Sequence, residues 1–178
     1  MVTATAPAID RIEKSRDFHA WLLDQATRLR LGDMRVDRES LAEELEAMAA
    51  RERRELRSHL EVLLKHLLKW QSQPNRRGMS WRNSVKVARR GIEDLLEDSP
   101  SLKPLVIELI SKAYARARTD AADEMRLTRA QAARLPEACP WTVEQLLVVC
   151  NVEIGINEAP SKRTRQPPPN LPLVRGRD

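Results

Sequence analysis

Three side chains that could hold a metal ion or move a proton recur at an even spacing between residues 50 and 70. Glu52, His59 and His66 lie seven residues apart, and because two helical turns take about seven residues, a helix would place all three on roughly one side. Metal sites in helical bundles usually carry Glu-x-x-His motifs on facing helices, whereas here no acidic residue lies three positions before His59 or His66. We therefore expect two packed histidines and a solvated or paired Glu52, with a metal-dependent hydrolase as the lesser alternative.

Cationic and aromatic residues gather near residue 70 and could bind nucleic acid. Residues 51–90 contain 12 Lys or Arg against 3 Glu, which is a local charge of +9. Single-stranded nucleic acid is bound by aromatic rings that stack on bases and by cations that contact phosphates. The candidate binding residues, called the basic patch below, are Lys65, His66, Lys69, Trp70, Arg76, Arg77, Trp81 and Arg82.

A packed helix corner explains the same residues, and we favour it over a ligand-binding surface. Trp70 and Trp81 flank the loop predicted at 72–79. Both indoles can fold over this loop if each buried indole N–H finds an acceptor. Lys69 would then lay its aliphatic stem along a Trp and keep its ammonium group in water. The remaining Lys and Arg residues would form a solvated face.

The sequence does not contain a recognisable catalytic centre. It has no nucleophile triad, no Gly-rich phosphate loop and no Cys–His metal motif, so an enzyme is the less favoured class. We assign no catalytic residue, no metal ligand and no cofactor. We expect a non-catalytic interaction module that binds an unknown protein partner or itself as a homo-oligomer. Weakly specific, salt-sensitive nucleic-acid binding through residues 51–90 is the alternative.

The composition indicates a helical protein with a substantial core. The chain has 178 residues, of which 42% are hydrophobic and only 5 are Gly, and this favours helices over sheets. No apolar run approaches the length of a membrane span, and the N-terminus lacks the apolar core of a signal peptide. Together with two isolated cysteines, these features predict a cytoplasmic protein that does not enter the membrane.

Helical periodicity predicts an all-α fold. Four main helices are expected at 16–31, at 38–72, at 81–97 and from Ser101 to about Met125, with a weak helix at 128–135 and a short C-terminal helix at 143–150. In the longest of them, apolar residues at 41, 45, 48, 56, 60, 63, 64, 67 and 68 predict one buried face. The architecture is an antiparallel helical bundle of the four main helices, closed at one end by the short helix.

Capping residues and glycines predict the ends and contacts of these helices. The helical pattern begins at Ser15 or Asp17. In chain order, the predicted caps are Gly32 as a left-handed C-terminal residue, Asp37 or a competing Ser40–Glu43 capping box, Ser80, Ser101, and a Thr142–Gln145 capping box. Gly91 lies inside the third helix, where a glycine costs about 1 kcal/mol relative to Ala. A close approach of another helix at Gly91 would explain it.

The chain is expected to have one ordered domain between two irregular ends. Residues 1–14 lack periodicity and predict a flexible leader. Residues 15–150 form the helical bundle domain. Residues 151–178 are rich in Pro and Arg and predict a disordered tail.

Several of these motifs, in the same order, carry a resemblance to a known family. They are the block from Leu60 to Gln71, Ser80-Trp81-Arg82, the junction from Asp98 to Leu102, Cys139-Pro140-Trp141-Thr142 with Glu144-Gln145, and upstream Asp17-Phe18, Trp21 and Glu43-Glu44. Over about residues 15–150 the chain resembles the bacterial family called domain of unknown function 29. The one mild departure is Trp141, where Tyr or Phe is expected. The resemblance implies a small helical protein and carries no activity, substrate or cofactor.

Overall fold

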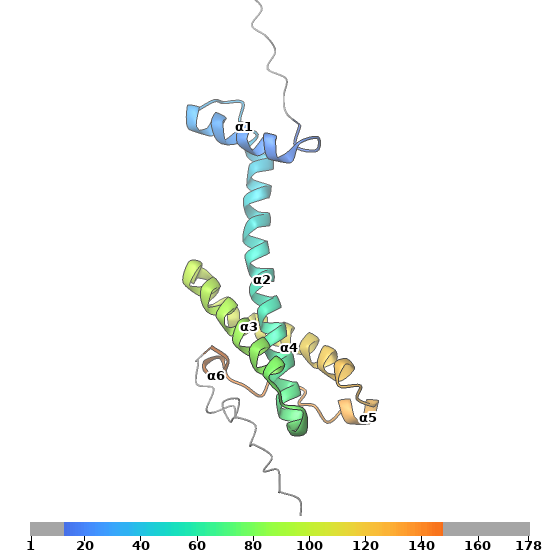
Figure 1. Ribbon diagram of the computed structural model, residues 1–178. Coiled ribbons are helices and arrows are strands. Elements are labelled where there is room, and N and C mark those ends of the chain that lie inside the picture. The colour runs from blue at the N-terminus through green and yellow to red at the C-terminus, as the bar shows by residue number, and fades with distance from the viewer. Residues whose placement is uncertain (1–12, 148–178) are drawn as a thin grey trace, which may run out of the picture. The chain divides into compact units, whose positions relative to one another are not determined.

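The computed structural model describes residues 13–147, and every regular element in this part of the chain is a helix (Figure 1). The elements are α1 (Phe18–Leu31), α2 (Arg38–Ser72), η1 (Pro74–Arg76), α3 (Met79–Asp98), η2 (Pro100–Leu102), α4 (Leu105–Glu124), α5 (Arg129–Ala132) and α6 (Val143–Leu147). The predicted all-α fold is confirmed, with four long helices and a short late one. None of the helices in this part is both long and apolar enough to cross a membrane. The predicted tail, and the predicted leader up to residue 12, lie outside the described residues.

The first two helices begin and end close to the predicted positions, and Asp17 is the N-cap of the first. Asp17 Oδ1 accepts a hydrogen bond from Ala20 N at 2.9 Å, and α1 ends at Gly32, whose φ of 66° is left-handed. Asp37 Oδ1 accepts a hydrogen bond from Ser40 N at 3.2 Å, which is the N-cap geometry. The competing start at Ser40 is therefore wrong, since Ser40 lies inside the first turn of α2.

The two serines that were predicted to cap the next helices do not cap them. α3 begins one residue before Ser80, directly after Gly78 in an extended conformation. Ser101 lies within the 3-10 turn η2, which buries Leu102, and α4 begins only after Pro104. Neither serine therefore occupies the N-cap position, which is the residue directly before an α-helix.

Two capping boxes begin the short helices. Thr142 N donates to Gln145 Oε1 at 3.0 Å and Gln145 N donates to Thr142 Oγ1 at 3.3 Å, so the predicted box is confirmed. Thr128 and Gln131 make the same reciprocal pair at the start of α5. The weak helix predicted at 128–135 is thus shortened to one capped turn.

The chain divides into two compact units, Met1–Arg53 and Arg54–Asp178. They are called the N-terminal unit and the C-terminal unit below. The N-terminal unit contains α1 and the first part of α2, and the C-terminal unit contains the rest of α2 and all later helices. The four long helices are therefore distributed over two units.

The N-terminal unit has a thin interior. Among its described residues only Trp21 and Gln25 are buried. Gln25 Oε1 accepts a hydrogen bond from Asp37 N at 2.8 Å, which ties α1 to the start of α2. Lys14 Nζ pairs with Glu44 Oε1 at 2.9 Å and lies over the Trp21 ring at 5.4 Å from its centroid.

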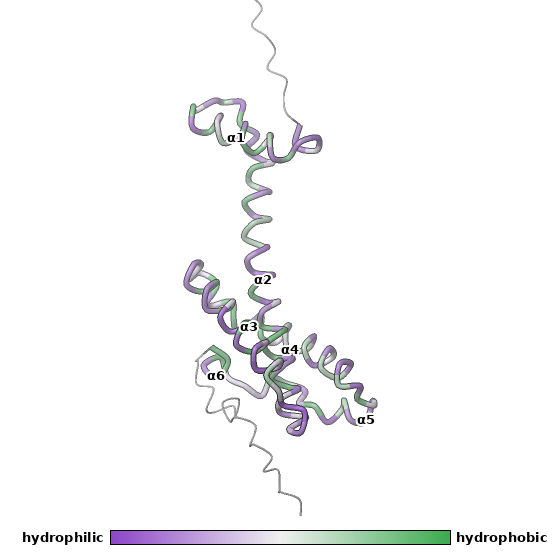
Figure 2. The backbone as a smooth tube through the Cα atoms, viewed as in Figure 1, coloured by the Kyte–Doolittle hydropathy of each residue, from purple (hydrophilic) through white to green (hydrophobic). Residues whose placement is uncertain are grey.

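The hydrophobic core lies in the C-terminal unit, where apolar stripes of α2, α3 and α4 pack together with α6 (Figure 2). Its members include Leu56, Leu60, Leu63, Leu64, Leu67 and Leu68 of α2, Val85, Ala88, Ile92 and Leu96 of α3, Val106, Leu109, Ile110, Ala113, Ala117 and Ala121 of α4, and Leu146 of α6. Each fully buried Leu contributes about 1.5–3 kcal/mol to folding. The α2 part of this core consists of the predicted apolar positions from Leu56 to Leu68.

The predicted buried face of α2 is buried only in its second part. In the N-terminal unit Leu41 is half-buried, whereas Leu45 is 66% exposed and Met48 is 57% exposed. These three residues are called the apolar face of α2 below. The expectation that Leu45 and Met48 are buried is wrong, because a period of 3.6 residues shows that a face is apolar and not what covers it.

Candidate functional site

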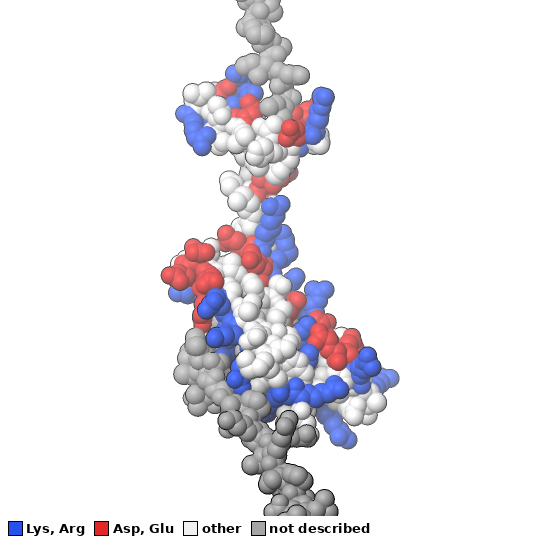
Figure 3. All heavy atoms as spheres, viewed as in Figure 1, with Lys and Arg blue, Asp and Glu red and all other residues white. Residues whose placement is uncertain are grey.

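The basic patch lies in the C-terminal unit, where α2 ends and α3 begins. Lys65, His66, Lys69 and Trp70 are in the last turns of α2, Arg76 is in η1, Arg77 follows it, and Trp81 and Arg82 are in the first turn of α3. Figure 3 shows Lys and Arg side chains gathered at this end of the unit. The fold thus brings the predicted residues to one corner, and ligand binding there stays a prediction.

Two cations of the patch are paired with one carboxylate of α4. Lys65 Nζ lies 2.7 Å from Glu124 Oε1, and Lys69 Nζ lies 2.6 Å from Glu124 Oε2. The hydrogen bonds from Lys65 and Lys69 lower the pKa of Glu124 from 4.5 to about 2. No local pattern predicts this partner, since Glu124 follows Lys69 by 55 residues. Both ammonium groups are therefore partly neutralised within the protein.

Lys69 is packed against an aromatic ring and does not extend into water. Its Nζ lies 4.7 Å from the centroid of the Trp81 ring, and the residue is only 8% exposed. A cation over an indole contributes about 0.5–2 kcal/mol, with the larger values at desolvated sites. The prediction that Lys69 keeps its ammonium in water is wrong, because Trp81 and Glu124 replace the water.

Trp70 belongs to the core of the C-terminal unit. It is 3% exposed, and its indole Nε1 is enclosed without an acceptor among the described residues. The guanidinium carbons of Arg77 and Arg82 lie 5.3 and 6.0 Å from its ring centroid, and Arg77 Nε donates to the Trp70 carbonyl at 2.9 Å. A base has no room to stack on a ring covered in this way, which leaves Trp81 as the half-exposed indole of the patch.

His66 is half-buried and uncharged at neutral pH. Burial, and then the charges of Lys69 and Lys65, lower its pKa from 6.5 to about 4. Its Nδ1 atom is enclosed and has no hydrogen-bond partner among residues 13–147. His66 therefore adds no positive charge to the basic patch.

His59 is a packing residue of the C-terminal unit. Its imidazole lies against Gly91, where a Cβ would stand 2.5 Å from His59 Cε1. The close approach predicted at Gly91 is confirmed, and the neighbour is a side chain of α2. In the described part of the chain, no three residues of the His, Cys, Asp and Glu types lie close enough to hold a metal ion.

Comparison with known proteins identifies a family but no annotated or solved relative. Neither a curated protein nor a solved structure matches the chain. The family model described as domain of unknown function DUF29 matches residues 15–149, a range that includes α1 to α6 and the whole basic patch. The chain therefore belongs to the DUF29 family.

Proposed function

We propose that the protein is a non-catalytic interaction module whose N-terminal unit binds a second copy of the chain. The observation that carries this proposal is the apolar surface of that unit. Of the ten large hydrophobic side chains that are exposed among the described residues, seven belong to the N-terminal unit: Phe18, Leu23, Leu29, Leu31, Met34, Leu45 and Met48. Exposed apolar groups concentrated in this way are typical of protein-binding surfaces.

The apolar face of α2 is a suitable centre for a helix–helix contact. Leu41, Leu45 and Met48 are spaced by four and three residues, which is the spacing of the contact positions in a two-helix coiled coil. In a paired arrangement Leu45 of one copy would pack against Met48 of the other. Covering these two side chains removes apolar surface from water, which stabilises the pair by about 25 cal/mol for each Å² buried.

The charges beside this face favour an antiparallel pair of identical helices. Glu44 and Arg51 lie seven residues apart on the same flank of the apolar face. In an antiparallel pair equivalent flanks meet, so Glu44 of each copy would face Arg51 of the other, twice by the two-fold symmetry. In a parallel pair that flank would face Ala49, which offers no charge. Glu44 pairs with Lys14 through its Oε1, so its second oxygen would serve Arg51.

Sedimentation velocity of the full chain over a range of concentrations tests the pairing. We expect a monomer–dimer equilibrium for the wild type and a monomer for Leu45→Glu combined with Met48→Glu. Val87→Glu is the matched control, because Val87 is equally exposed but lies in the C-terminal unit. A wild type that stays monomeric at high micromolar concentration, or a dimer that survives the double substitution, would overturn the proposal.

A charge exchange tests the antiparallel orientation separately. Glu44→Arg alone would place two Arg side chains opposite each other and weaken the dimer. Adding Arg51→Glu would restore the pair in reversed order, which gives dimerisation close to that of the wild type. Failure of this rescue, with a dimer still sensitive to Leu45→Glu, would exclude the antiparallel register.

Nucleic-acid binding through the basic patch is the second candidate. Arg76 and Arg77 are exposed on and beside η1, and cations at such a corner suit phosphate contacts. We expect weak, salt-sensitive binding, and Arg76→Glu with Arg77→Glu should abolish it, whereas the distant Lys103→Glu should not. Unchanged affinity of the double variant in an anisotropy titration at low salt would remove this site.

A further inference from the structure

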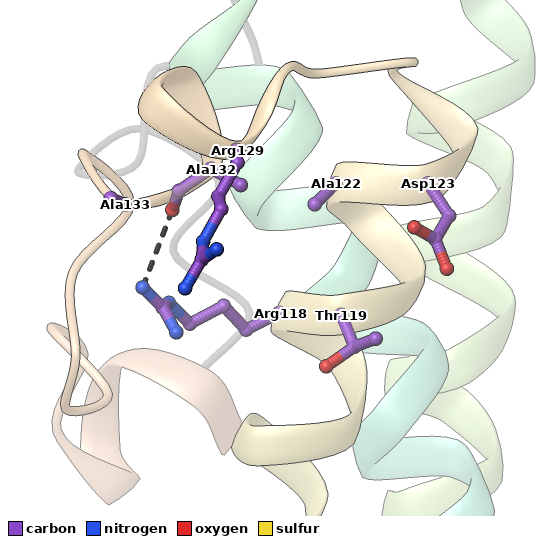
Figure 4. A pocket seen from close by; sticks show the side chains of 7 residues that line it. All are labelled: Arg118, Thr119, Ala122, Asp123, Arg129, Ala132 and Ala133. Atoms are coloured by element: carbon purple, nitrogen blue, oxygen red, sulfur yellow. Dashed lines mark hydrogen bonds between the residues drawn. The ribbon is translucent and has the colours of Figure 1, made fainter.

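A cavity of about 340 Å³, widely open to solvent and lined by exposed and half-buried residues, lies between α4 and α5 in the C-terminal unit (Figure 4). It is lined by Arg118, Thr119, Ala122 and Asp123 of α4, by Arg129 and Ala132 of α5, and by Ala133. The basic patch does not share any of these residues. The volume of the cavity is within the range of small-molecule sites, about 300–1,000 Å³.

The connection between the two helices builds the cavity. After α4 the backbone turns at Arg126, whose φ of 54° is left-handed. Leu127 N then donates to Ala122 O at 3.0 Å, and the capping box of Thr128 and Gln131 starts α5 at once. The single turn of α5 is thus held beside the last turns of α4, and the side chains of both line the space between them.

Arg118 is anchored in the cavity by one side of its guanidinium. Its Nη2 donates to the carbonyl oxygens of Ala132 and Leu135, both at 3.3 Å. Its Nε atom is enclosed and has no acceptor among the described residues. Because the Nε atom is enclosed, a ligand would reach the guanidinium through its terminal nitrogens, and two backbone carbonyls hold the group in place for such a contact.

Arg129 supplies a second positive charge beside the first. Figure 4 shows its side chain extending into the cavity toward the Arg118 guanidinium, while the Asp123 carboxylate points away from both. The two guanidiniums therefore converge on the side of the cavity away from Asp123, and the positive potential that attracts anions is highest between them.

We propose that this cavity binds a small organic anion whose phosphate or carboxylate group lies between Arg118 and Arg129. Two guanidiniums can donate to several oxygens of such a group at once. Ala122, Ala132 and Ala133 form the apolar wall for the body of the ligand. Thr119, on the α4 side, offers a hydroxyl to a polar group at its other end.

The test is a titration of the full chain that is monitored by NMR. Glycerol 3-phosphate is the phosphate probe and succinate is the carboxylate probe. Ionic strength is held constant, so that general charge screening does not change. We expect saturable shifts confined to residues 118–133 with one of the probes. Tighter binding of glycerol 3-phosphate assigns the site to phosphates, and tighter binding of succinate assigns it to carboxylates.

Arg129→Met is the decisive variant, because the Arg129 side chain is exposed and removing its charge leaves the Arg118 hydrogen bonds in place. We expect the dissociation constant to rise about tenfold or more, which corresponds to losing one charge-assisted contact. Arg134→Met is the matched control, since Arg134 is an exposed neighbour that does not line the cavity. Absence of saturable binding by both probes, or equal affinity of Arg129→Met and wild type, would overturn the proposal.

Discussion

The imidazole of His59 occupies the space that a side chain at Gly91 would need. A Cβ on Gly91 would lie 2.5 Å from His59 Cε1 and 2.7 Å from Nε2, closer than carbon and nitrogen atoms approach without overlap. Helix propensity alone would favour Ala at this position in α3 by about 1 kcal/mol. The glycine is therefore explained by the packing of α3 on α2.

Gly91→Ala should destabilise the protein although alanine is the better helix former. The added methyl group overpacks the α2–α3 contact, which typically costs about 1–3 kcal/mol, and this exceeds the gain in helix propensity. Chemical denaturation followed by circular dichroism measures the difference. In a His59→Ala background the same substitution should become neutral or stabilising, and a penalty that persists there would show that His59 is not its cause.

Stability should fall as the pH is lowered from 6.5 to about 4, and His66 should account for part of that fall. The pKa of His66 is lowered to about 4 in the folded protein, so in this range the unfolded chain binds the proton more readily and is favoured. His66→Met has no group that titrates there and should show a flatter profile of unfolding free energy against pH. An unchanged slope in the variant would mean that His66 titrates alike in both states.

Glu124→Gln should lower stability at neutral pH through loss of its pairs with Lys65 and Lys69. Glu124 is 42% exposed, so screening limits the loss to about 0.5–1 kcal/mol. Because its pKa in the folded protein is about 2, the carboxylate contributes stability above pH 4.5 and loses it as the pH falls toward 2. The difference between Glu124→Gln and the wild type in the free energy of unfolding should shrink over the same pH range. The neighbouring Asp123→Asn is the control and should show no such difference at pH 7.

Gly32→Ala should destabilise the N-terminal unit by about 1 kcal/mol. Gly32 ends α1 at a φ of 66°, and no atom lies within 4 Å of the position of an added Cβ, so the cost comes from backbone strain alone. Gly78→Ala is the control, because Gly78 is extended and its Cβ would have an ordinary contact of 3.9 Å. Hydrogen exchange of the α1 amides reports the effect locally, and equal protection in both variants would contradict it.

Features that depend on neighbouring residues were predictable from the sequence. The bounds of α2, the caps Asp17 and Asp37 and the Thr142–Gln145 box are local, since a cap bonds a backbone group two or three residues away. Ser80 and Ser101 failed as caps because residue type does not show whether a turn begins one residue earlier or later. The all-α class and the apolar stripes of the core also follow from a short period, so the sequence alone determined them.

Relationships between distant residues were decided only by the tertiary structure. The positions of Lys65 and Lys69 were visible in the sequence, but their partner Glu124 was not, because packing of α4 on α2 brings it close. The burial of Trp70, the exposure of Leu45 and the convergence of Arg118 with Arg129 have the same origin. Periodicity tells which side of a helix is apolar or charged, whereas the neighbour that covers or faces it depends on how the helices pack.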